Sequence, residues 1–291
     1  MTILYHYCDA NAFLSIVRNK KLWLCSTNKM NDLNEGSVVE RELRRRMEGR
    51  YDSLSCQSVQ VGIDVFRNET YACCFSGKAD STVQWMTYAD EGKGFAIGFD
   101  SRVLLDRYYD YAKQFDADDY FRMAESSREE NCFSLGPVLY FGRDSKERIM
   151  NALLGVLDEI GPKGSDTDLR LFGVSTMAAQ FDAVVKDEAF SHENEFRLTH
   201  TPEGVTVLSL LGENARKRES RLGEVRWRTT RYGLAPYYEF AFDPGAIEEI
   251  WIGPRNPDHV NVSAQHLLSM FCVENDIPEA RIEMSKSPYR G

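Results

Sequence analysis

The first 26 residues follow, in order, the patterns of a strand, a helix and a strand. Residues 3–8 are mostly apolar, Asp9 is a favourable helix N-cap, and residues 11–21 place their apolar side chains on one helical face. Residues 22–26 then alternate as a second strand does. A unit this compact holds its first strand rigidly. We therefore expect His6, at the end of that strand, to line a cleft around which the chain is organised.

Length and charge narrow the class of protein. The chain has 291 residues, enough to bury a sizeable core, and its 43% hydrophobic and 27% charged residues are typical of globular domains. A net charge of −10 disfavours a general nucleic-acid binder. The start carries no basic and apolar leader pattern, and no apolar run reaches the roughly 20 residues of a membrane helix. We expect a cytoplasmic protein with no membrane partner.

The cysteines and histidines give no sign of a metal site. The seven cysteines are odd in number, scattered and often inside apolar runs, which favours reduced, buried thiols over a disulfide framework. No pair is spaced as CxxC, and the five histidines match no zinc signature. We expect no metal cofactor.

The remaining chain predicts one α+β domain over residues 1–291. Further strands are expected at 70–76, 95–100, 193–199, 205–211, 237–242, 247–252 and 281–284, and helices at 37–51 and 260–274. Residues from about 101 to 190 are predicted to be mostly helical and to form an insertion. The glycines at 92, 94 and 98 miss the dinucleotide fingerprint and precede a strand, which excludes a Rossmann motif.

Two charged stretches are candidates for function. In the strand predicted at 193–199, alternation places Glu193, Glu195 and Arg197 on one face, although such a pattern alone is usually a solvated surface. Residues 214–231 are rich in arginine and lysine, opposed only by Glu219 and Glu224. A charged loop without a role is the commoner explanation of that run. It is also where a phosphate-bearing ligand would best find its counter-charge.

Several short stretches together resemble a bacterial family known as domain of unknown function 2971. They are Leu4-Tyr5-His6-Tyr7, Asn31-Asp32, Cys74-Phe75-Ser76, Gln84-Trp85-Met86 with Tyr88-Ala89, residues 94–100, residues 193–197, Ile252-Gly253-Pro254 and Ser287-Pro288-Tyr289. The strand, helix and strand of the opening also resemble the first half of the ADP-ribosyltransferase fold. This second resemblance is remote and rests on far fewer residues.

The second resemblance implies a fold and an activity. The fold would be an ADP-ribosyltransferase-like split, mixed and antiparallel β-sheet core with helices and the helical insertion. The protein would consume NAD as substrate, as a mono-ADP-ribosyltransferase or an NAD glycohydrolase, and act as a toxin or phage-defence effector. A macromolecular acceptor, protein or nucleic acid, would bind near Arg216, Arg218, Arg226 and Arg228, and a partner protein could inhibit the enzyme. The alternative is a non-catalytic nucleotide- or partner-binding module on the same fold.

The resemblance also implies residue roles. Glu195 would be catalytic, stabilising the positive charge that develops as nicotinamide leaves, and Glu193 would act as general base towards the acceptor. His6 would bind the adenosine ribose of NAD, unless it is an ordinary strand histidine bonded to a backbone carbonyl. Arg197 is a further cofactor-binding candidate. The aromatic that stacks on nicotinamide stays open between Tyr88, Trp85 and Phe95, with Tyr88 preferred. Ser26, after the second strand, is a further polar candidate.

Overall fold

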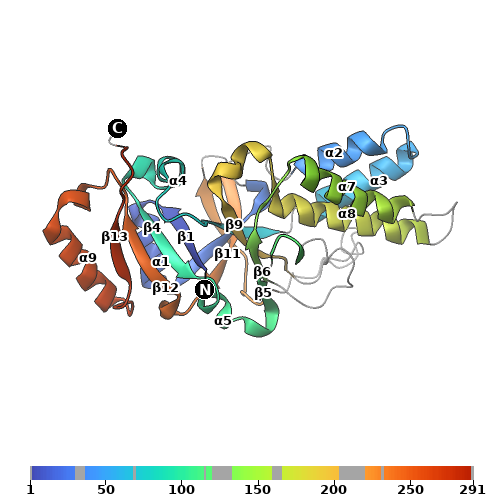
Figure 1. Cartoon of the computed structure of the whole chain (residues 1–291). Helices are drawn as coiled ribbons and strands as arrows, with labels where there is room; N and C mark the ends of the chain where they lie inside the picture. The colour runs from blue at the N-terminus through green and yellow to red at the C-terminus, as the bar shows by residue number, and fades with distance from the viewer. Residues whose placement is uncertain are drawn as a thin grey trace.

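The computed structural model describes residues 2–29, 37–67, 70–114, 116–119, 133–158, 166–202, 220–230 and 233–289. These residues form a mixed α+β fold, in which an 11-stranded sheet of parallel and antiparallel strands is covered by helices (Figure 1). Its strands are β1 (Ile3–Cys8), β2 (Lys21–Ser26), β3 (Tyr71–Ser76), β4 (Phe95–Asp100), β5 (Ala112–Gln114), β6 (Phe133–Pro137), β9 (Glu195–His200), β10 (Arg226–Thr230), β11 (Gly233–Ala241), β12 (Ile247–Ile252) and β13 (Arg281–Met284).

Two short strands and the α-helices lie outside the main sheet. β7 (Leu139–Tyr140) and β8 (Val185–Lys186) pair with each other alone. The helices are α1 (Ala10–Asn19), α2 (Val38–Met47), α3 (Ser53–Arg67), α4 (Thr82–Tyr88), α5 (Val103–Asp106), α7 (Arg143–Asp158), α8 (Asp166–Val184) and α9 (Val262–Glu274). A six-residue 3-10 helix, η4 (Glu188–Glu193), lies between β8 and β9. None of the described helices is both long and apolar enough to cross a membrane.

The opening unit folds as its sequence predicts. The Asp9 carboxylate accepts a hydrogen bond from the Ala12 backbone N–H, and α1 buries Phe13, Ile16 and Val17. One expectation is corrected: His6 lies inside β1, two residues before its end. The strand continues to Cys8 because the apolar run and its pairing with β4 extend that far.

β3 is the strand at which the sheet divides. β9 pairs along one whole edge of β3, from Tyr71 to Ser76. On the other edge, β2 pairs at Tyr71 and Ala72, whereas β1 pairs at Ser76. Because β1 and β2 diverge there, the described strands leave Cys73–Phe75 without a ladder partner on that edge. The sheet is therefore split along this edge of β3, beside Cys73–Phe75.

Strand register sorts the side chains onto two faces, because residues opposite each other in a ladder point the same way. One face, here called the core face, carries the main hydrophobic core with α1 and α9. It includes Leu4, Leu22, Leu24, Phe75, Leu198 and Phe240. The other, here called the opposite face, carries Tyr5 and Tyr7, which pack with Trp85 of α4. Chemistry that needs two side chains together therefore needs them on the same face.

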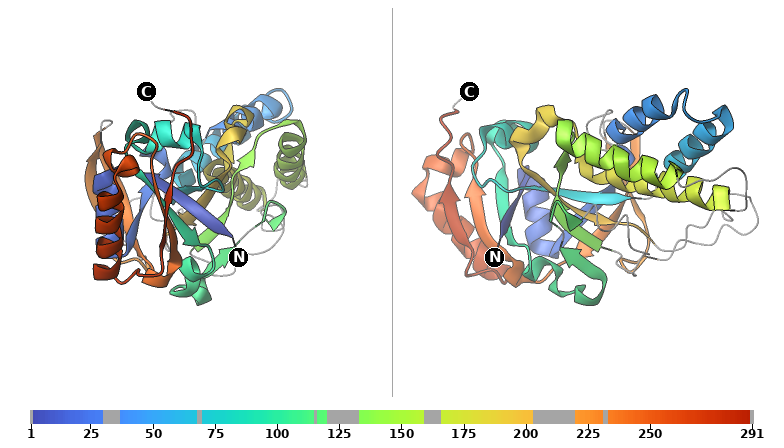
Figure 2. Two further views of the ribbon diagram at one scale, coloured as in Figure 1. Left: turned by 60° about the vertical axis from the view of Figure 1, so that its left-hand side comes forward. Right: turned by 45° about the vertical axis from the view of Figure 1, so that its right-hand side comes forward.

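A second core holds α2, α3, α7 and α8 together as a helical layer at one end of the molecule (Figures 1 and 2). α7 and α8 come from the segment 101–190 that was predicted to be helical, but α2 and α3 come from residues 38–67. The segment 101–190 also contributes β6, which pairs with β9 in the main sheet. The segment therefore contributes to the main sheet as well as to the helical layer.

Other predicted elements have mixed outcomes. The strands expected at 70–76, 95–100, 237–242, 247–252 and 281–284 correspond to β3, β4, β11, β12 and β13, and the helix expected at 260–274 to α9. The strand expected at 205–211 lies outside the described residues. Within the basic run 214–231, residues 226–230 form β10, because they pair antiparallel with β11.

The crossing of α3 and α8 yields a prediction. A Cβ atom added at Gly62 would lie 2.4 Å from the Ser175 Oγ, whereas one added at Gly155 of α7 would meet nothing within 4 Å. Gly62→Ala should therefore lower the free energy of unfolding by about 1–3 kcal/mol despite its better helix propensity. The control Gly155→Ala should be neutral or stabilising by up to about 1 kcal/mol. Urea titration of both variants measures this, and equal stability of the two would contradict it.

Candidate functional site

A buried cluster of four charged side chains lies where the helical layer meets the sheet. It consists of Lys186 on β8, Glu193 at the end of η4, and Glu195 and Arg197 on β9, each at most 5% exposed. The Lys186 Nζ lies 2.6 Å from Glu193 Oε2 and 3.1 Å from Glu195 Oε2. The Arg197 Nε lies 2.7 Å from Glu195 Oε1. Two cations thus balance two carboxylates out of contact with water.

This arrangement depends on one residue with a left-handed backbone conformation. Asn194 has φ 47°, a conformation that asparagine tolerates better than most residues, and it turns the chain from η4 into β9. The strand predicted from residue 193 therefore begins at Glu195. Glu193 is not a strand residue, but the turn still brings its carboxylate to the same lysine that binds Glu195. The solvated surface that this pattern usually forms is not observed, since all three predicted residues are buried.

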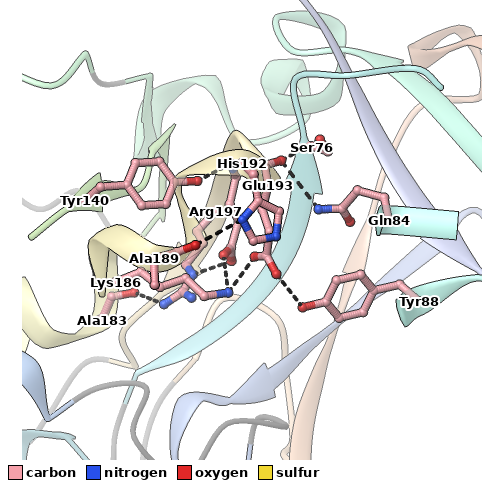
Figure 3. A network of polar contacts seen from close by, with 11 residues as sticks. Ser76, Gln84, Tyr88, Tyr140, Ala183, Lys186, Ala189, His192, Glu193 and Arg197 are labelled. Atoms are coloured by element: carbon pink, nitrogen blue, oxygen red, sulfur yellow. Dashed lines mark hydrogen bonds and ion pairs between the residues drawn. The ribbon is translucent and has the colours of Figure 1, made fainter. Parts of the chain in front are cut away.

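Neighbouring elements anchor the cluster from several sides (Figure 3). The Ser76 hydroxyl of β3 donates to the Glu193 carbonyl over 2.8 Å. The Arg197 Nη1 donates to the Ala183 carbonyl of α8 over 2.8 Å. The Glu195 backbone N–H donates to the Tyr140 hydroxyl of β7 over 2.8 Å. The backbone of Glu193 and Glu195 and the side chain of Arg197 are consequently held by β3, β7 and α8.

The charges hold Glu195 in its ionised form. Burial alone would raise the pKa of this carboxyl, but the Arg197 guanidinium, the Lys186 ammonium and a hydrogen bond from the Cys74 thiol outweigh burial and lower the pKa to about 2. Glu195 is therefore a fixed anion at every physiological pH.

Tyr88 is the aromatic residue that reaches the cluster. Its hydroxyl lies 3.4 Å from Glu193 Oε1, a long hydrogen bond, and burial raises the pKa of this phenol. Of the other candidates, Trp85 is fully buried and packs edge-on against Tyr7, and Phe95 stacks on Phe13 at 4.2 Å between ring centroids. Trp85 and Phe95 are therefore core residues, and Tyr88 alone of the three contacts a carboxylate of the cluster.

His6 lies on the core face and does not join the cluster. Its Nδ1 lies 2.9 Å from the Cys74 carbonyl, so the ring nitrogen must donate its proton there, and its ring packs edge-on against Phe75. Burial lowers the pKa of the imidazole more than this bond raises it. The register places Glu195 on the opposite face, level with Ser76 and Tyr5. His6 and Glu195 both contact Cys74, His6 through its carbonyl and Glu195 through its thiol.

The remaining predicted site residues lie on β2 or β10, or outside the described residues. Ser26 is buried at the end of β2 opposite Tyr71, on the core face with His6. Arg226 and Arg228 lie on β10, and Arg216 and Arg218 fall outside the described residues. Sequence reasoning missed Lys186 and Cys74. The signal available for Lys186 was a lysine directly after the apolar run Ala183-Val184-Val185.

The described residues contain no group of three or more His, Cys, Asp or Glu side chains placed to hold a metal ion. None of the six described cysteines forms a disulfide.

Comparison with protein-family models finds a match to part of the chain. The model of a family described as "Protein of unknown function (DUF2971)" matches residues 84–198. The matched range contains Tyr88, Lys186, Glu193, Glu195 and Arg197, and it excludes His6 and Ser26. The match supports the resemblance to this family over that part of the chain. No curated protein and no solved structure matches the chain.

The lowered pKa of Glu195 predicts how stability depends on pH. Its stabilising contribution is fully present above the ordinary carboxyl pKa of about 4.5 and is lost as the pH falls towards 2. The contribution is on the order of 3 kcal/mol. The difference in unfolding free energy between wild type and Glu195→Gln should therefore shrink between pH 5 and pH 3 in urea titrations. A difference that stays constant over this range would contradict the assignment.

Removing the shared cation should be costly. Lys186→Met leaves two buried carboxylates with one guanidinium, and should destabilise the protein by about 3–5 kcal/mol. Adding Glu193→Gln to this variant should restore part of the loss, because the charge is balanced again. Lys93→Met, at a half-exposed lysine, is the control and should change stability by less than about 0.5 kcal/mol. Thermal or urea unfolding of wild type, Lys186→Met, Glu193→Gln and the double variant measures the coupling, and simple additivity of the two single changes would refute it.

Proposed function

We propose that the chain is an NAD-consuming enzyme, a mono-ADP-ribosyltransferase or an NAD glycohydrolase, with Glu195 as its catalytic carboxylate. The observation that carries the proposal is the ionised Glu195, held through both oxygens in a buried site beside a second carboxylate and a phenol. A charge fixed in advance, away from water, is what stabilises a cation that develops only in the transition state.

In the proposed step, the bond between the ribose and the nicotinamide of NAD breaks, and its electron pair leaves with nicotinamide. Glu195 stabilises the positive charge that develops on the ribose, and Glu193 accepts the proton of the attacking hydroxyl, amine or water. Tyr88 packs against the leaving nicotinamide. Arg197 is a positioning residue, since its guanidinium binds Glu195 and the Ala183 carbonyl.

Lys186 allows a ribose hydroxyl to bind Glu195 without leaving a buried charge unpaired. Its Nζ bonds both carboxylates, and the contact with Glu193 is the shorter at 2.6 Å. When a ribose hydroxyl donates to Glu195 Oε2, the ammonium can remain paired with Glu193. No charge is then left buried without a partner. His6 lies on the other face of the sheet and has no part in this step. Its imidazole instead donates to the Cys74 carbonyl, where β1 and β2 separate.

A second function is favoured by the balance of charges in the same cluster. Both oxygens of Glu195 already have partners, and the four side chains are nearly inaccessible to water. Such a cluster would equally well fasten the helical layer to the sheet of a non-catalytic nucleotide- or partner-binding module. The two functions differ in whether the charge of Glu195 is needed for turnover.

The test is nicotinamide release from NAD, with and without cell lysate, by wild type, Glu195→Gln and Glu193→Gln. Glu195→Gln should lower release by about 100-fold or more, because it removes the fixed charge and keeps the volume. Glu193→Gln should impair label transfer to a macromolecule more than hydrolysis. Glu91→Gln, at an exposed carboxylate, is the control. Undiminished release by Glu195→Gln would refute the role of Glu195, and no release by wild type would favour the binding module.

A further inference from the structure

The opposite face of the sheet extends from the cluster across β3 to β2, β11 and β10. The ladders align Cys25 with Tyr237 and Tyr237 with Arg226, so these side chains share that face. By alternation, Lys21 and Trp23 of β2, Glu239 of β11 and Arg228 of β10 lie on it too. Residues distant in sequence therefore form one surface rich in arginine and aromatic side chains.

A cavity of about 580 Å³ opens on this surface. Its charged lining consists of the cations Lys21, Arg221 and Arg226 and the carboxylates Glu224 and Glu239. Cations therefore outnumber anions here, in a chain whose net charge is −10. A volume of this order suits a small ligand or one unit of a polymer.

One carboxylate is shared between two of these cations. Glu239 Oε2 lies 2.7 Å from the Lys21 Nζ and 3.3 Å from the Arg226 Nη2. The side chain of Glu239 is mostly buried, whereas that of Arg226 is 58% exposed. Glu239 therefore holds the base of the cavity in place, and the outer part of the Arg226 guanidinium is accessible to an anion.

Arg228 adds a donor that needs an acceptor. Its guanidinium lies over the Trp23 ring, 5.6 Å from the ring centroid. Its Nε is buried and has no hydrogen-bond partner in the described part of the chain. Buried donors are nearly always satisfied in native proteins, so an unpartnered one calls for a specific explanation. The Trp23 indole beside it is 39% exposed, which leaves aromatic surface free next to the guanidinium.

We propose that this surface binds a nucleoside phosphate, presented either as a free nucleotide or within single-stranded nucleic acid. Arg226 and Arg228, two positions apart on one strand, offer the planar donor pairs that bind phosphate oxygens. The exposed part of the Trp23 indole offers the stacking surface that bases of any sequence use. The combination of paired arginines with an adjoining indole favours this ligand over inorganic phosphate alone. The inference does not depend on the activity proposed for Glu195.

The test is equilibrium binding without NAD. A fluorescently labelled single-stranded RNA octamer is titrated with the protein at several salt concentrations, and ATP and inorganic phosphate serve as competitors. Arg226→Gln with Arg228→Gln should weaken RNA binding at least 10-fold and reduce the slope of log Kd against log salt by about two. Trp23→Leu should weaken binding with little change in that slope. The control with the same charge change is Arg102→Gln with Arg148→Gln, at the exposed Arg102 directly before α5 and the exposed Arg148 on α7.

The outcomes separate the two sources of the ligand. Competition by ATP at comparable concentration identifies a mononucleotide site, and RNA binding that ATP does not displace identifies a nucleic-acid site. Arg226→Lys with Arg228→Lys keeps the charge and the fold but removes the planar donors, and should retain only part of the affinity. Equal affinity of the glutamine double variant and the control, competition by phosphate as effective as by ATP, or no binding by wild type at the lowest salt would overturn the proposal.

Discussion

The Lys186 ammonium between two carboxylates is the interaction on which the site depends. Glu193 and Glu195 are two residues apart, and their carboxylates would repel each other in a buried site without a shared cation. The same lysine belongs to β8, directly after α8, so the ion pairs also connect the helical layer to the main sheet. Buried ion pairs contribute little net stability but are costly to break singly. The cluster therefore fixes an arrangement of charges more than it strengthens the fold.

The split in the sheet determines which residues can act together. β1 and β2 separate along one edge of β3, and the His6 imidazole donates to the Cys74 carbonyl in that gap. Cys74 in turn directs its thiol to Glu195 on the other face. The Cys74 carbonyl lies in the plane of the sheet and its side chain points out of it, so one residue of β3 serves both a structural histidine and the charged cluster. The resemblance to ADP-ribosyltransferases joined His6 and Glu195 in one site, whereas the register separates them.

Local patterns in the sequence predict several of the individual elements. Alternation or apolar runs indicate β1, β2, β4, β12 and β13, and Asp9 indicates the start of α1. They do not predict the left-handed Asn194 that ends η4, so the strand predicted from Glu193 began two residues too early. Nor do they predict which face a residue occupies, because that depends on the register of β3 against three other strands. Local patterns also miss the ion pair between Lys186 and Glu195, because it depends on the turn between β8 and β9.

The ionised, buried state of Glu195 underlies both the architecture and the proposed chemistry. Carbon-13 NMR of the glutamate carboxyl groups measures it directly, with the Glu195 resonance assigned from the Glu195→Gln variant. This resonance should stay at its ionised position from pH 7 down to pH 4 in the folded protein, since the pKa of Glu195 is about 2. A Glu195 resonance that titrates with a midpoint at or above pH 4.5 while the protein remains folded would contradict it.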